Sequence, residues 1–173
     1  MDLSNINIKI MFNKLFSTPI LYIKLRENLL TVKNVKNGEI YEDEPVVAID
    51  DKKKILAVGK QAHTLKTKNN VVIVNGFSHP RTIINDFLMA EKALQYAVSQ
   101  MYKNRFFPLS PIAVIQPMEK IEGGLTLIER RALREMAQGA GAREVFIWVG
   151  RELTDDEIIS RNYPLSAGTL FEH

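Results

Sequence analysis

The side chains best suited to chemistry gather around Gly123 and Gly124, just before a predicted helix. The free amide groups at a helix N-terminus can bind an anion. The loop lacks the Lys-Ser/Thr ending of a P-loop, and its glycines do not form the G-x-G-x-x-G pattern. Glu119, Glu122 and Glu129 crowd the same stretch and would repel a phosphate unless a cation accompanied it. The spacing therefore permits anion binding without specifying a phosphate loop.

Thr126 and Glu129 allow two interpretations. Their spacing matches a capping box, in which the threonine hydroxyl accepts from the third helical amide and the glutamate reaches back to the cap amide. Alternatively, Glu129 orients a water molecule as a catalytic residue, and Thr126 joins Gly123 and Gly124 in binding a cofactor. The capping box is a sufficient structural reason for both residues, so the catalytic role stays a hypothesis.

Metal chemistry is not expected. His63, His79 and His173 are scattered, and none has helical metal-ligand spacing to a carboxylate. The chain has no cysteine, which excludes disulfides and thiolate metal sites and fits a reducing compartment.

The elements that would position these residues form a predicted βαβ unit. Apolar strands are expected at 112–115 and 145–148, and the helix between them should end at Gly139 or Gly141. The parallel pairing that this unit implies requires cover on both faces of the sheet.

Upstream, the pattern predicts an antiparallel meander followed by shorter strands and one long helix. Asn37-Gly38 predicts a type I′ hairpin, because both central residues of that turn need positive φ. The expected strands are 21–26, 29–35, 39–41, 45–49, 55–58 and 71–74, and the expected helices are 61–65 and 83–104.

The two ends of the chain differ from this middle. An amphipathic segment at 1–18 places apolar side chains on one helical face, with lysines on other sides: Ile8, Met11, Phe12, Leu15 and Phe16. Such a face suits a membrane surface, but also docking on its own domain or an oligomer contact. A short acidic helix capped by Thr154 is expected within 153–160, and 162–173 reads as an extended tail. The organisation predicted is a segment 1–18, one domain 19–150 and a tail 151–173.

Composition is that of a soluble globular protein, with 46% hydrophobic and 25% charged residues among 173. No apolar run approaches a membrane span, and Asp2 sits where a signal peptide has basic residues. The net charge of +3 is small, and Asp50-Asp51 offsets the lysines at 52–54. A cytoplasmic protein that does not bind nucleic acid is expected.

Several stretches resemble the first domain of the MreB family of bacterial actin homologues, which direct rod-shaped growth. They are 75–81, 86–87, 90–92, 115–117, and above all 124–132 and 139–145. The resemblance implies an α/β, actin-like or ribonuclease H-like fold, with a mixed sheet of a three-strand meander plus parallel strands, flanked by helices. Residues 11–16 also resemble the amphipathic N-terminal segment by which members of this family bind the membrane.

One departure from the family concerns its nucleotide site. Members bind ATP with magnesium between two domains, and Glu129 matches their water-positioning glutamate. The first phosphate loop should fall near 23–29, where this chain has Lys24 to Asn28 without the aspartate or the glycine. The family's second phosphate loop belongs to a second domain that these residues do not include. We therefore expect no ATP cofactor and no ATP hydrolysis.

Three functions remain open at this point. The first is a non-catalytic MreB-like protein that contacts filament subunits, its own copies or the inner face of the membrane. The second is an ATPase half-domain completed by dimerisation or by another chain. The third is a membrane-surface adaptor on an actin-like scaffold.

Overall fold

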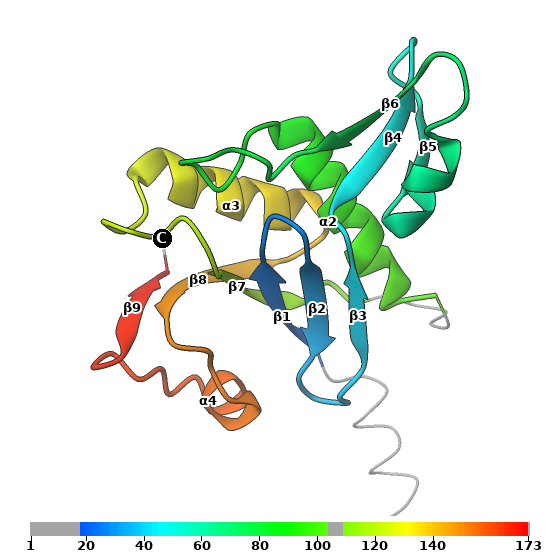
Figure 1. Cartoon of the computed structure of the whole chain (residues 1–173). Helices are drawn as coiled ribbons and strands as arrows, with labels where there is room; N and C mark the ends of the chain where they lie inside the picture. Colours follow the sequence, from blue (N-terminus) through cyan, green and yellow to red (C-terminus); the bar gives the residue numbers. More distant parts are fainter. Residues whose placement is uncertain (1–17, 104–108, 173) are drawn as a thin grey trace, which may run out of the picture.

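A computed structural model describes residues 18–103 and 109–172 as two sheets with helices around them (Figure 1). The candidate membrane residues Ile8, Met11, Phe12, Leu15 and Phe16 lie outside the described residues, as does His173.

The larger sheet has six strands in the order β3-β2-β1-β7-β8-β9. Their bounds are β1 (Ile20–Leu25), β2 (Leu30–Asn34), β3 (Ile40–Asp43), β7 (Ile112–Pro117), β8 (Glu144–Gly150) and β9 (Gly168–Phe171). Strands β1, β2 and β3 form the predicted antiparallel meander, and β7 is parallel to both β1 and β8. The mixed sheet expected from the sequence is therefore present, with β9 added antiparallel to β8.

The hairpin between β2 and β3 forms, but its turn differs from the prediction. Gly38 has φ 77°, whereas Asn37 is not among the residues with positive φ. The amide of Gly38 donates to the carbonyl of Asn34 at 2.8 Å. A single left-handed glycine at the end of a longer loop replaces the two-residue type I′ turn.

The crossover between β7 and β8 is α3 (Leu127–Gly139), as predicted. Gly141, with φ 101°, supplies the left-handed conformation after the helix. The other long helix, α2 (Phe87–Gln100), begins later than the expected residue 83. Asp86 caps it by accepting from the amide of Met89, while Ile83 is buried in the core before the helix starts. Apolar periodicity extended the predicted helix because Ile83 packs inside without being helical.

Both faces of the large sheet are covered. Helices α2 and α3 pack on one face around the core that contains Leu94, Leu133 and Ile147. The other face is covered by a segment that includes α4 (Asp155–Ser160), through Ile158 and Tyr163. We call residues 153–172 the C-terminal segment. The tail at 162–173 was expected to be extended and poorly attached; residues 168–171 are extended but are paired in the sheet as β9, so the expected poor attachment is wrong for them.

The smaller sheet has three strands in the order β5-β4-β6 and lies at one end of the molecule (Figure 1). Its elements are β4 (Val46–Asp50), β5 (Ile55–Val58), the 3₁₀ helix η1 (Lys60–Leu65) and β6 (Val71–Asn75). Val47 and Val58 pack against Met89 and Ala93 of α2. The small sheet is thus anchored on the helix that also covers the large one.

Candidate functional site

The first candidate site lies where the parallel strands β1 and β7 end. Ligands of open α/β sheets bind outside the carboxyl ends of the strands. The hairpin at 25–29 follows β1, and the loop at 118–126 follows β7. The two are joined directly, since the amide of Met118 donates to the carbonyl of Leu25 at 2.9 Å and the amide of Glu27 donates to Glu119 Oε2 at 3.0 Å.

The side chain of Glu27 occupies the centre of this junction. Its carboxylate accepts from Lys120 Nζ at 2.9 Å and from Ser78 Oγ at 3.1 Å. Lys120 Nζ also donates to the carbonyl of Phe77 at 2.8 Å. The hydrogen bond from Lys120, followed by that from Ser78, lowers the pKa of the Glu27 carboxyl group below its ordinary value. The loop between β1 and β2 is therefore held against Ser78, Glu119 and Lys120 by hydrogen bonds within the chain, and we call it the closed hairpin.

Little space remains beside the hairpin. The cavity lined by residues of the hairpin and of 119–120 has a volume of about 10 Å³. A cavity of roughly 10–15 Å³ holds about one water molecule. This cavity is too small for a phosphate group.

The sequence-predicted residues at 123–129 lie in the neighbouring loop. The Glu129 carboxylate accepts from the Thr126 amide at 2.9 Å, and the Glu129 amide donates to Thr126 Oγ1 at 3.2 Å. The capping box is therefore formed, and Glu129 serves in it. Whether Glu129 also orients water stays a prediction.

Gly123 and Gly124 have φ values of 86° and 82°, and a Cβ on either would meet nothing within 4 Å. They are exposed turn residues, and the Gly124 amide already donates to the carbonyl of Ile121 at 2.9 Å. Their left-handed backbone explains why glycine occurs at both positions. The anion-binding role predicted for them stays a prediction.

Sequence reasoning missed the partnership of Glu27 with Lys120. The two residues are 93 positions apart, so no local motif connects them. Among the described residues, Glu119 rather than Glu129 contacts the hairpin. The local signal in the sequence was the absence, at 24–28, of the aspartate and the glycine that the resemblance implies.

The described histidines have other partners. His63 Nε2 lies 2.6 Å from Glu44 Oε2. His79 Nδ1 accepts from the amides of Arg81 and Thr82 at 3.1 Å each. Within residues 18–103 and 109–172, no three His, Cys, Asp or Glu side chains are grouped so as to hold a metal ion.

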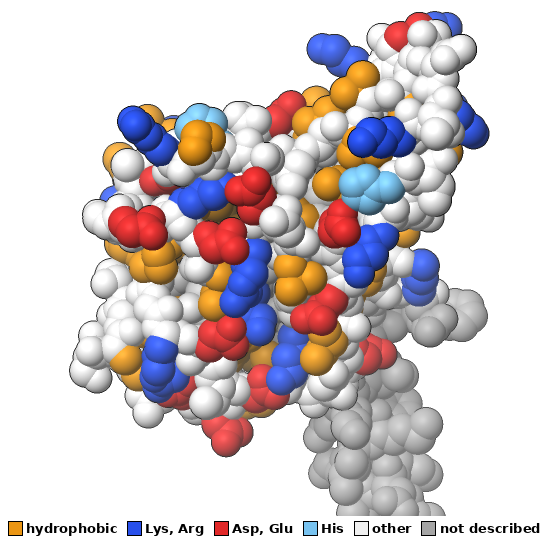
Figure 2. All heavy atoms as spheres, viewed as in Figure 1, with side chains coloured by type: hydrophobic (Ala, Val, Ile, Leu, Met, Phe, Trp, Pro, Cys, Tyr) orange, Lys and Arg blue, Asp and Glu red, His pale blue; other side chains and the backbone are white. Residues whose placement is uncertain are grey.

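Figure 2 shows acidic and basic side chains mixed over one face of the molecule. Across the part of the chain that the structure describes, no helix combines the length and apolar character needed to cross a membrane.

The family described as MreB/Mbl protein matches residues 23–152. The chain is 39% identical over 126 residues to the cell shape-determining protein MreB of Escherichia coli K12, covering 68% of this chain and 34% of the relative. It is 32% identical over 118 residues to the cell shape-determining protein Mbl of Bacillus cereus, covering 66% of this chain and 33% of Mbl. The chain thus spans about a third of the length of these curated relatives.

Solved structures give the same picture of the fold. MreB5 of Spiroplasma citri bound to ADP superposes with a TM-score of 0.59 at 24% identity, covering 76% of this chain and 38% of MreB5. The MamK double helical filament gives a TM-score of 0.57 at 16% identity, covering 77% of this chain and 41% of MamK. The α/β actin-like fold expected from the sequence is confirmed.

Proposed function

Because the chain belongs to the MreB/Mbl family, we propose that it is a cytoskeletal protein of cell-shape determination that acts by contact with filament subunits and not by ATP hydrolysis. Both curated relatives described above carry cell shape in their names. The observation that carries the non-catalytic part is the closed hairpin at 25–29.

The closed hairpin opposes phosphate binding in two ways. Glu27 and Lys120 fill the space beside the strand ends, leaving about 10 Å³. Glu27 and Glu119 also place two carboxylates where a phosphate would need donors. Hydrolysis requires nucleotide, metal and water to be positioned together. Glu129, engaged in its capping box, does not provide that arrangement by itself.

The surface proposed for subunit contact is the start of α3. Leu127 and Ile128 are 72% and 80% exposed, the largest exposures among the large apolar side chains of the described residues. Contiguous exposed apolar surface marks interaction sites, and these two side chains are neighbours in the chain. A relative with this fold has been solved as a double helical filament. We assign the partner as a filament subunit of the MreB/Mbl family, of this chain or of a longer relative.

The membrane role of residues 1–18 stays a prediction. It places a cytoplasmic protein at the inner face of the membrane. Deletion of residues 1–18 should abolish flotation with anionic liposomes while leaving filament contact intact. Loss of filament contact in the deletion variant would contradict this separation of roles.

Co-sedimentation with polymerised Escherichia coli MreB tests the proposed contact. The chain should pellet with the filaments, and an Ile128→Asp variant should pellet about tenfold less, since a buried unpaired carboxylate is costly at an interface. Leu165→Asp is the matched control, because Leu165 is 69% exposed outside α3. Absence of co-sedimentation, or an equal loss in both variants, would overturn the proposal.

A further inference from the structure

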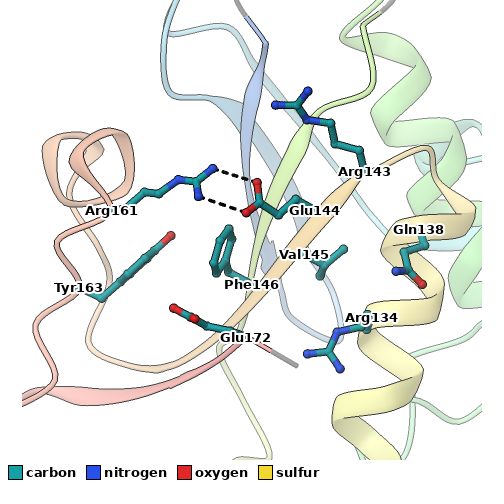
Figure 3. Close-up of a pocket in the computed structure, with 9 residues that line it drawn as sticks. All are labelled: Arg134, Gln138, Arg143, Glu144, Val145, Phe146, Arg161, Tyr163 and Glu172. Carbon is teal, nitrogen blue, oxygen red and sulfur yellow. Dashed lines mark hydrogen bonds and ion pairs between the residues drawn. The ribbon is translucent and has the colours of Figure 1, made fainter.

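A second hollow lies beside the large sheet where β8 begins, between α3, the start of β8 and the C-terminal segment (Figure 3). Its volume is about 330 Å³, within the roughly 300–1,000 Å³ of small-molecule pockets. It exists because β9 pairs only with Ile147–Gly150 of β8, so the pairing stops before Glu144 and Phe146. We call it the arginine pocket, after Arg134, Arg143 and Arg161 in its lining.

One of the three arginines is already neutralised. Arg161 donates to both oxygens of Glu144, at 3.1 and 2.8 Å, and its guanidinium lies 5.3 Å from the ring centroid of Phe146. Figure 3 shows this pair forming one wall of the pocket. A bidentate pair of this kind is rigid and cancels its own charge. The pair therefore forms part of the pocket wall, and the net charge of the pocket is set by its other lining residues.

One donor atom of the half-buried Arg134 has no partner in the part of the chain that the structure describes. Its Nη2 atom is buried and makes no hydrogen bond within the described residues. Arg130, one helical turn earlier, has a buried Nε in the same condition, with its guanidinium 4.6 Å from the ring centroid of Phe171. Leaving a buried donor unpaired is costly, and more so for a charged group. Of the two arginines, only Arg134 lines the pocket, so its unpaired donor is the one that a ligand there could satisfy.

The remaining charges set the sign of the ligand. Arg134 and Arg143 are positive and Glu172 is negative, so the lining carries one net positive charge once the Arg161–Glu144 pair is cancelled. Figure 3 shows Arg134 reaching from α3 toward Glu172, which follows β9, while Arg143 points away from Arg134 in this view. Burial raises the pKa of the Tyr163 hydroxyl to about 12, so this group stays protonated and can donate.

We propose that the arginine pocket binds a small ligand through one oxyanion group, a carboxylate or a phosphate, with Arg134 as the main donor. Guanidinium groups recognise both anions through the same planar array of N–H donors. The pocket is separate from the hairpin at 25–29, so the inference does not depend on the absence of nucleotide there.

Titration calorimetry of the full chain with sodium phosphate and with sodium acetate, at constant ionic strength, tests the proposal. At least one anion should bind saturably at a single site, and the two arms tell phosphate from carboxylate. Arg134→Gln should weaken that binding about tenfold or more. Arg131→Gln is the matched control, because Arg131 lies on the same helix but pairs with Glu135 and has a side chain 79% exposed.

A third variant is expected to bind more tightly, which misfolding could not explain. Glu172→Gln removes the carboxylate that opposes the anion, so it should tighten binding severalfold. The proposal is overturned if neither anion binds saturably to the chain. It is also overturned if Arg131→Gln weakens binding as much as Arg134→Gln, or if Glu172→Gln leaves the affinity unchanged.

Discussion

For Glu129, two roles were considered: orienting a water molecule in catalysis, and completing the capping box of α3. Its carboxylate accepts from both the amide and the hydroxyl of Thr126, at 2.9 and 2.8 Å. These two hydrogen bonds hold the Glu129 side chain in one orientation at the start of α3. The structural role is thus sufficient to explain the residue, as its spacing indicated.

The capping role leads to a stability prediction. Thr126→Ala should lower the free energy of unfolding by about 1 kcal/mol, because the amide of Glu129 loses its acceptor. Glu129→Gln should change it by less than about 0.5 kcal/mol, since glutamine also completes a capping box. Urea denaturation measures both. A large loss in Glu129→Gln alone would point to a role for its charge beyond the cap.

Glu157 carries a pH dependence. Hydrogen bonds from Arg151, and then from the Thr154 amide, lower its pKa from 4.5 to about 2. A depressed carboxyl pKa stabilises the folded state above the unfolded pKa, and this contribution is lost as the pH falls through the folded pKa. The stability difference between the chain and Glu157→Gln should stay constant above about pH 5 and shrink between about pH 4.5 and 2.

Urea denaturation across this pH range checks the prediction. Asp156→Asn is the control, since Asp156 is in the same turn of α4 and its side chain makes no ion pair among the described residues. If the difference in free energy of unfolding between the chain and Glu157→Gln did not vary between pH 5 and 2, the Arg151–Glu157 pair would not contribute to stability as described.

At the scale of elements, the C-terminal segment completes the second face of the large sheet. The buried side chains of Tyr22, Gln116 and Trp148 form a polar network with the backbone of residues 150–153, where the segment begins. The Tyr22 hydroxyl donates to Gln116 and accepts from the Leu153 amide, and Trp148 Nε1 donates to the carbonyl of Arg151 at 2.7 Å. These contacts fix the segment in one position on the sheet.

Two adjacent isoleucines of α4 test this docking. Ile158 is 1% exposed and Ile159 is 45% exposed. Ile158→Ala should lower the free energy of unfolding by about 2–5 kcal/mol, because it leaves a cavity against the sheet. Ile159→Ala should stay within about 0.5 kcal/mol of the unsubstituted chain.

The fluorescence of Trp148, the single tryptophan of the chain, reports the transition directly. Its ring is fully buried and stacks on Tyr163 at 6.2 Å between centroids. Equal losses in Ile158→Ala and Ile159→Ala would mean that the segment does not pack on the sheet as described.

Local patterns explain what could be predicted and what could not. The capping box at Thr126, the cap at Thr154 and the βαβ unit depend on residues close in sequence, so they could be predicted from spacing. The docking of the C-terminal segment depends on contacts such as Leu153 with Tyr22, 131 positions apart. The arginine pocket likewise is lined by residues of α3, β8 and the C-terminal segment, so no single stretch of sequence could predict it.

At the scale of the whole molecule, the family match and the fold do not end at the same place. The match covers residues 23–152, whereas the second face of the sheet is covered by residues 153–172. The match alone would therefore leave Phe146 and Trp148 uncovered. In this chain, residues beyond the matched region supply part of the core.

The central claim is that the hairpin at 25–29 is closed by the chain's own side chains and does not receive a nucleotide. Calorimetric titration of the Arg134→Gln variant with Mg-ATP and Mg-ADP tests this directly, because the variant weakens anion binding in the arginine pocket. We expect no saturable binding of either nucleotide. Micromolar affinity, reduced by substituting Lys120 at the hairpin, would contradict it.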